Sequence, residues 1–148
     1  VDVYTFIDNE KKRRGTDLHL LLGALSPVSS ASSDVAICMG IDLNSGSHLD
    51  WTERNSANRN NMSVAFELTK LLQNNGFVDT YRQFYPNEVL FQGFNAMRGN
   101  AKVYNNREEF MFAKGHQLKL LESKIVTVVP DSIAKAELAV ISEFEIVD

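Results

Sequence analysis

Asp42 and Asn44 are the two residues whose types and spacing most directly suggest chemistry. They stand two apart in the stretch Gly-Ile-Asp-Leu-Asn, which closes the apolar run of residues 34–42. Residues two apart on a strand share one face. A carboxylate and a carboxamide delivered together to the end of a buried strand can therefore act on the same ligand.

Two further groups of side chains could bind a metal ion. His48 and Asp50 could form a metal pair, although the pattern equally indicates a loop held by packing of Trp51 and by aspartate hydrogen bonds, which we favour. Glu108 and Glu109 are adjacent in a predicted strand. Because neighbours on a strand point to opposite faces, they could chelate one ion only across a bulge.

A dense basic cluster is the third chemical feature, and it consists of Lys11, Lys12, Arg13 and Arg14. In a solvated hairpin turn these cations need no function; alternatively they contact the phosphate backbone of RNA or DNA, with a patch that extends to Arg98, Lys102 and Arg107. The net charge of −4 does not attract nucleic acid or an anionic membrane through the overall field. No apolar run approaches the roughly 20 residues that a membrane-spanning helix needs, so we expect no membrane partner.

The elements that must position these residues follow from the apolar pattern. The chain has 148 residues, 44% of them hydrophobic, which suits one domain with a sizeable core. One helix is predicted by the 3.6-residue period over 62–75, and residues 87–106 are predicted as a long loop. Six strands are predicted, at 1–8, 16–25, 34–42, 107–115, 118–129 and 137–147. We therefore expect an α/β (α+β) layered sandwich with a mostly antiparallel or mixed β-sheet and few helices.

Four stretches of the sequence resemble the C-terminal half of the exonuclease–endonuclease–phosphatase superfamily. They read MGIDLNSGSHLDWT, NNGFVDTYRQFYPNE, FMFAKGHQLKLLESKIV and LAVISEFEI, and the resemblance extends from about Thr16 to Val147. Members of this family are metal-dependent phosphoester hydrolases with two β-sheets between layers of helices. The resemblance implies that residues 1–148 form a single truncated domain, similar to half of that four-layer fold.

The resemblance assigns catalytic positions to four residues. Asp42 and Asn44 match the family aspartate and asparagine that orient the attacking water and the phosphate. Glu109 replaces a family aspartate, and Glu137 replaces the histidine that serves as general base. A solvated glutamate, with a reference pKa near 4.3, is a much poorer base than an imidazole near 6.5.

Other family positions also depart from the pattern. Ala24 aligns with a histidine that stabilises phosphate charge, at the end of a family strand, and Ala136 aligns with the aspartate that orients the general base. The family helix between the second and third strands is expected to be missing, with residues 26–33 in its place. The metal-binding glutamate belongs to the half of the family fold that the resemblance does not cover.

These replacements favour a module without catalysis. Losing a general base typically costs about 10²–10⁴ in rate, and losing a charge-stabilising donor about 10²–10³. We therefore expect a structural or binding module in a larger assembly, with no cofactor, in which another protein chain or a second copy covers an exposed sheet face.

Two alternatives remain open at the level of sequence. The first is an active Mg²⁺-dependent phosphodiesterase, phosphatase or nuclease with a rearranged site built from Asp42, Asn44, Glu109 and Glu137. The second is a nucleic-acid-binding subunit without catalysis that uses the basic cluster. The sequence indicates no cellular compartment.

Overall fold

The computed structural model describes residues 7–8, 10–31, 35–95, 105–128 and 137–147. Three strands form one antiparallel sheet in the order β1-β3-β2: β1 is Ile37–Asp42, β2 is Val78–Asp79 and β3 is Glu109–Lys114. A second sheet is the antiparallel hairpin of β4, Leu118–Val128, and β5, Glu137–Ile146. The predicted α+β class, with antiparallel sheets and few helices, is confirmed.

The described helices lie in two parts of the chain. A π-helical turn, Lys11–Gly15, leads directly into α2, Thr16–Ala31. The remaining helices are a 3₁₀ turn at Ser56–Arg59, then α3, Glu67–Asn74, and α4, Thr80–Phe84. None of the helices in the described ranges is both long and apolar enough to cross a bilayer.

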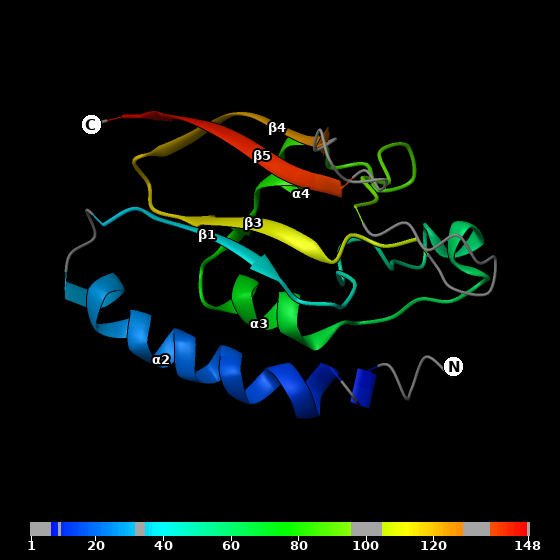
Figure 1. Ribbon diagram of the computed structural model, residues 1–148, viewed down its shortest axis with the longest axis horizontal. Helices are drawn as coiled ribbons and strands as arrows, with labels where there is room; N and C mark the ends of the chain where they lie inside the picture. The colour runs from blue at the N-terminus through cyan, green and yellow to red at the C-terminus, as the bar shows by residue number, and fades with distance from the viewer. Residues whose placement is uncertain (1–6, 9, 32–34, 96–104, 129–136, 148) are drawn as a thin grey trace.

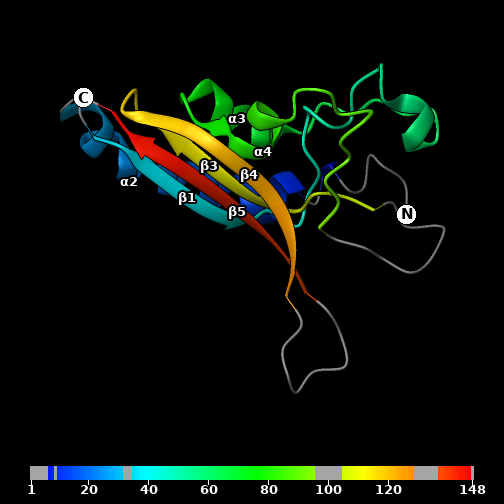
Figure 2. The ribbon, with the colours of Figure 1, turned by 90° about the horizontal axis from the view of Figure 1, so that it is seen from above.

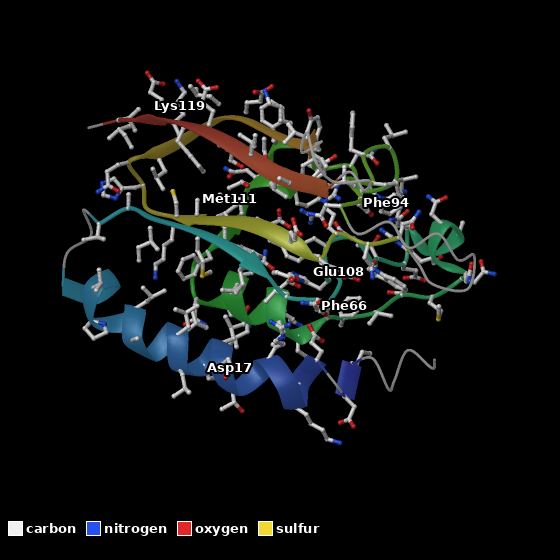
Figure 3. All side chains as sticks on the ribbon, viewed as in Figure 1. Asp17, Phe66, Phe94, Glu108, Met111 and Lys119 are labelled. Carbon is white, nitrogen blue, oxygen red and sulfur yellow. The ribbon has the colours of Figure 1, made fainter. Side chains whose placement is uncertain are left out.

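The elements stack in layers, and Figures 1 and 2 show their order. Helices α2 and α3 cover one face of the sheet that contains β1 and β3, and the β4–β5 hairpin lies over the opposite face. The core between helices and sheet contains Leu18, Leu68, Leu72, Phe110 and Phe112, each 3% exposed or less. Long loops gather at the end of the sheet where Phe66 and Glu108 lie (Figure 3).

The strand predicted for residues 16–25 is wrong, because this segment forms the first part of α2. Leu18, Leu22 and Leu25 recur at helical spacing and pack on the sheet, whereas Leu20 is 69% exposed. A continuous apolar run does not distinguish a strand from a buried helix by periodicity alone. The alignment of Ala24 with a histidine at a strand end is therefore wrong as well.

Two related expectations also fail. Residues 26–31 do not take the place of a helix, because they form the last part of α2, and residues 32–33 lie outside the described residues. The basic cluster does not form a hairpin turn but lies in the π-helical turn before α2. Of the strand predicted at 1–8, residues 7–8 are helical and residues 1–6 lie outside the described residues.

The predicted helix over 62–75 is shorter than expected. It begins only at Glu67, and Met62, Val64 and Phe66 before it pack against Trp51 without forming a helix. The Val64 amide donates to the carbonyl of Trp51 at 2.9 Å, and Phe66 meets the indole edge-to-face at 5.6 Å. The strand at 34–42 and the three strands from residue 107 onward are confirmed as β1, β3, β4 and β5.

Two leucine substitutions test the helical assignment of Thr16–Ala31. On a strand, Leu18 and Leu20 would share a face, but in α2 the first is 3% and the second 69% exposed. We expect Leu18→Ala to lower the free energy of unfolding by about 2–5 kcal/mol, and Leu20→Ala by about 0.5 kcal/mol or less. Urea denaturation followed by circular dichroism measures both. Equal losses in the two variants would contradict the assignment.

Candidate functional site

Asp42 and Asn44 lie together at the end of β1, but not as two strand residues on one face. The strand ends at Asp42, and Asn44 has a positive φ of 46°, in the left-handed region that asparagine tolerates. The Asn44 backbone amide and its Nδ2 each donate to an oxygen of the Asp42 carboxylate, both at 2.8 Å. The pair therefore forms a closed Asx turn, which corrects the simple strand geometry expected from the spacing.

Glu109 is brought next to this turn by the register of the sheet. It is the antiparallel partner of Asp42 across β1 and β3, and both residues are exposed. Glu108 points the other way and is 5% exposed, as expected for neighbours on a strand. Asp42, Asn44 and Glu109 thus supply the oxygen atoms from which a divalent-ion site could be built on this face.

Glu137 is not placed in the same sheet as the other three. It begins β5 and pairs with Val128 of β4, in the second sheet. Its side chain lies outside the described part of the structure, as does Ala136. In the described ranges, no three side chains of histidine, cysteine, aspartate or glutamate gather as a metal-binding group.

The residues of the basic cluster contact different partners. Lys11 forms an ion pair with Glu67 at 3.0 Å, and Lys12 forms one with Asp8 at 2.6 Å. Arg14 donates to the backbone carbonyl of Asp42 at 3.3 Å, and the side chain of Arg13 lies outside the described atoms. Two of the cations therefore face carboxylates, which weakens the positive field of this cluster.

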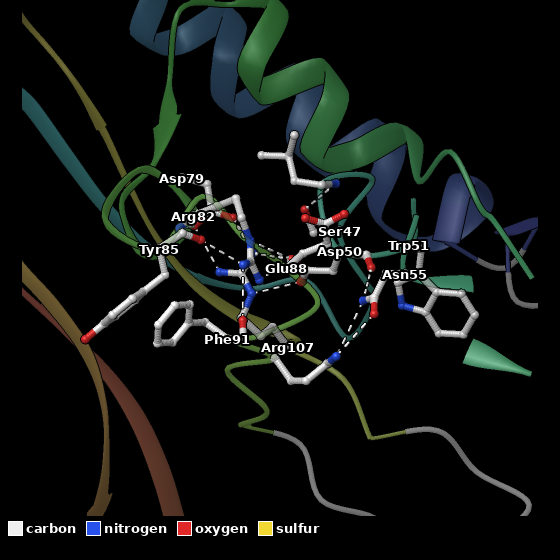
Figure 4. A network of polar contacts seen from close by, with 12 residues as sticks. Ser47, Asp50, Trp51, Asn55, Asp79, Arg82, Tyr85, Glu88, Phe91 and Arg107 are labelled. Carbon is white, nitrogen blue, oxygen red and sulfur yellow. Dashed lines mark hydrogen bonds and ion pairs between the residues drawn. The ribbon is translucent and has the colours of Figure 1, made fainter. Parts of the chain in front are cut away.

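The most buried ion pairs among the described residues lie elsewhere, in a set of Asp50, Asp79, Arg82 and Arg107 that we call the Asp–Arg network (Figure 4). Arg107 donates from Nε to Asp50 at 2.8 Å and from Nη1 to Asp79 at 2.9 Å. Arg82 donates from Nη2 to Asp50 at 2.7 Å. All four residues are 6% exposed or less, so each buried charge has an opposite charge in direct contact.

Aromatic rings complete the surroundings of Arg107. Its Cζ lies 5.1 Å from the ring centroid of Tyr81 and 5.0 Å from that of Phe110. Burial opposes the ionised form, but the charges of Asp50 and Asp79 outweigh it, so the pKa of Arg107 lies above the usual arginine value. The guanidinium is a permanent cation at the centre of the network.

This network was not predicted from the sequence, which placed Arg107 in a basic surface patch. Asp79 caps α4, since its carboxylate accepts from the Arg82 amide at 3.1 Å. The guanidinium of Arg82, however, reaches Asp50 across the fold. Arg107 is buried and belongs to no surface patch. Three stretches of the sequence each carry one or two of these charges: residues 47–52, residues 76–82 and the residues just before β3.

His48 and Asp50 do not form a metal pair, because each has other partners. Asp50 accepts from two arginines, while His48 Nδ1 lies 2.8 Å from Thr69 Oγ1 and Nε2 lies 2.7 Å from Gln73 Oε1. Burial lowers the pKa of His48, against an opposing effect of the Gln73 hydrogen bond. A neutral imidazole therefore ties this loop to α3, in agreement with the structural interpretation.

Comparison with known proteins gives little that bears on these residues. No family model matches the chain. A stretch of 56 residues, 38% of the chain, is 41% identical to the uncharacterized protein F14F9.5 of Caenorhabditis elegans. The match spans 18% of that relative's own length, and the relative's name states no activity.

Truncation of Arg107 tests how much stability the Asp–Arg network holds. In Arg107→Met the buried carboxylates of Asp50 and Asp79 lose a positively charged partner, and we expect the free energy of unfolding to fall by about 3–5 kcal/mol. The matched control is Lys119→Met, which removes an exposed ion pair with Glu145 and should cost about 0–1 kcal/mol. Denaturant unfolding of both variants gives the comparison. A loss in Arg107→Met no larger than in the control would show that the network contributes little.

Proposed function

We propose that the chain is a non-catalytic structural or binding module, built on a scaffold similar to that of a metal-dependent phosphoester hydrolase and held in a larger assembly. One observation carries this proposal. Asp42 and Asn44, the two residues that match the hydrolase pattern, are hydrogen-bonded to each other, since both carboxylate oxygens of Asp42 accept from Asn44. Two of the roughly four acceptor positions of this carboxylate are thus directed to the turn rather than to a metal ion or a water molecule.

The position that would hold a general base supports the same proposal. Glu137 stands where the resembling family has a histidine, and it lies in a different sheet from Asp42 and Glu109. A glutamate, with a reference pKa near 4.3, is a weak base near neutral pH. Asp50, Asp79, Arg82 and Arg107 are engaged with one another in the Asp–Arg network, which ties loops together.

The sheet offers a surface on which another polypeptide could dock. Strand β1 is at the edge of its sheet and contains neither lysine nor proline, the residues that commonly prevent edge-to-edge pairing. Cys38 and Gly40 are exposed on the face of β1 away from the helices. Ile141 and Ile146 of β5 are 48% and 71% exposed. A partner strand added to β1 would satisfy the hydrogen-bonding groups at its edge.

A hydrolysis assay tests the absence of catalysis. With bis(p-nitrophenyl) phosphate and Mg²⁺ or Mn²⁺, we expect product to form no faster with the chain than in buffer. Asp42→Ala should change nothing, and Glu109→Gln serves as the matched variant on the neighbouring strand. Metal-dependent turnover that disappears in Asp42→Ala would overturn the proposal.

Sedimentation velocity tests the docking surface, with a second copy of the chain as the partner. Gly40 has room for a side chain, because an added Cβ would meet only the Met111 Cε at 4.0 Å. We expect Gly40→Lys to leave the fold intact and to weaken a concentration-dependent association of the wild-type chain. A wild-type chain that stays monomeric at every concentration would exclude this self-association.

An Mg²⁺-dependent phosphodiesterase is the second candidate, and one observation favours it. The register of β1 and β3 sets the exposed carboxylates of Asp42 and Glu109 opposite each other. Two such carboxylates can share a divalent ion, which would then supply water activation and charge stabilisation. The hydrolysis assay above distinguishes this candidate from the first.

A further inference from the structure

Arg59 is a buried cation that the Asp–Arg network does not include. It ends the 3₁₀ turn Ser56–Arg59 and is 1% exposed. Its Cζ lies 5.1 Å from the ring centroid of Trp51 and 5.0 Å from that of Phe94. Nη1 donates to the carbonyl of Asn105 at 2.6 Å, but Nε and Nη2 have no hydrogen-bond partner among the described residues.

The two unpartnered atoms of Arg59 form one edge of the guanidinium. The Nε–H and one Nη2–H point in nearly parallel directions, and this fork matches two oxygens of a carboxylate or phosphate. A buried donor without a partner costs free energy, and more so when the group is charged. The structure therefore maintains an edge suited to bidentate anion recognition without using it internally.

The charges around Arg59 also leave it without a counterion of its own. Asp50 and Asp79 are in direct contact with Arg82 and Arg107, and no ion pair to Arg59 occurs within the described ranges. The pKa of Arg59 is lowered, mainly by burial and further by the positive charges of Arg107 and Arg82, against the attraction of Asp50. An added negative charge at this place would relieve the imbalance.

A pocket lies against this arginine. It has a volume of about 290 Å³ and is lined by Asn58, Arg59, Gln92, Phe94 and Asn105. This is close to the lower end of the volumes typical of small-molecule sites, about 300 Å³. Its lining combines one cation, three amide side chains and one aromatic ring, the composition expected for a small polar anion rather than an apolar ligand.

We propose that this Arg59 pocket binds a small ligand through an oxyanion, either a phosphate monoester or a carboxylate, held by the Nε–Nη2 edge. Both atoms are shielded from solvent, so a ligand in the pocket reaches them only after the side chains around them rearrange. The site goes beyond the proposed function and does not depend on whether the chain hydrolyses phosphoesters.

Trp51 provides a direct readout, because it is the single tryptophan of the chain and its ring contacts Arg59. The folded wild-type chain is titrated at constant ionic strength with inorganic phosphate, phenyl phosphate and benzoate, and the Trp51 emission and the heat of binding are recorded. We expect a saturable change with at least one probe. Phosphate-containing probes that bind in preference to benzoate identify a phosphate site, and the reverse order identifies a carboxylate site.

Variants of Arg59 test whether the bidentate edge of the guanidinium binds the ligand or whether a positive charge is sufficient. Arg59→Gln should weaken binding at least about tenfold, and Arg59→Lys should weaken it similarly because an ammonium lacks the bidentate edge. Lys119→Gln is the control with the same charge change, since Lys119 lies far from Phe94 along the long axis (Figure 3). It should bind as the wild type does. Phe94→Ala should keep or increase the affinity.

Two results would overturn the proposal. The first is the absence of a saturable signal in Trp51 emission and in heat with all three probes at millimolar concentration. The second is unchanged binding by either Arg59 variant that circular dichroism shows to be folded. If Arg59→Gln does not fold, the comparison of Arg59→Lys with Lys119→Gln decides the outcome.

Discussion

The contact of Arg107 with Asp50 and Asp79 is the interaction on which the loop end of the molecule depends. It joins the loop after β1, strand β2 and the segment that leads into β3. Through Asp50 it also reaches Arg82, whose Nη1 donates to the carbonyls of Tyr85 and Phe91 at 2.8 and 3.1 Å (Figure 4). A charge removed from water is tolerated only with its partners in place, so these four segments must be ordered together.

Two groups of polar residues lie at different places along the segment that follows β1. Asp42 and Asn44 close an exposed Asx turn directly after β1, beside Glu109. Farther along, Trp51 packs on Phe66 and on the guanidinium of Arg59, next to a pocket. The first group resembles a hydrolase site in residue types, and the second has a cation whose hydrogen bonds are incomplete. Ligand binding and phosphoester hydrolysis are therefore separate questions for this fold.

The errors of the sequence analysis have identifiable physical causes. The run TDLHLLLGAL is apolar enough for a strand covered on both faces, and only packing of Leu18 against the sheet shows that it is helical. Arg107 has no local sequence feature that distinguishes a buried arginine from one in a basic surface patch, and its burial follows from its contacts with Asp50 and Asp79. Nothing in the sequence indicated that Arg59 is buried, since a single arginine in a polar loop is expected to be solvated.

The sequence by itself determined the α+β class, the strands from β1 to β5 apart from the short β2, and the placing of Asp42 and Asn44 at the end of β1. These follow from the local apolar pattern and from residue order, which act over a few residues. Tertiary structure alone decided which arginine meets which aspartate, which of these ions is buried, and which donors are left without a partner. Those choices depend on contacts between residues 28 to 57 positions apart, whose energies come from desolvation and opposite charge rather than from local propensity.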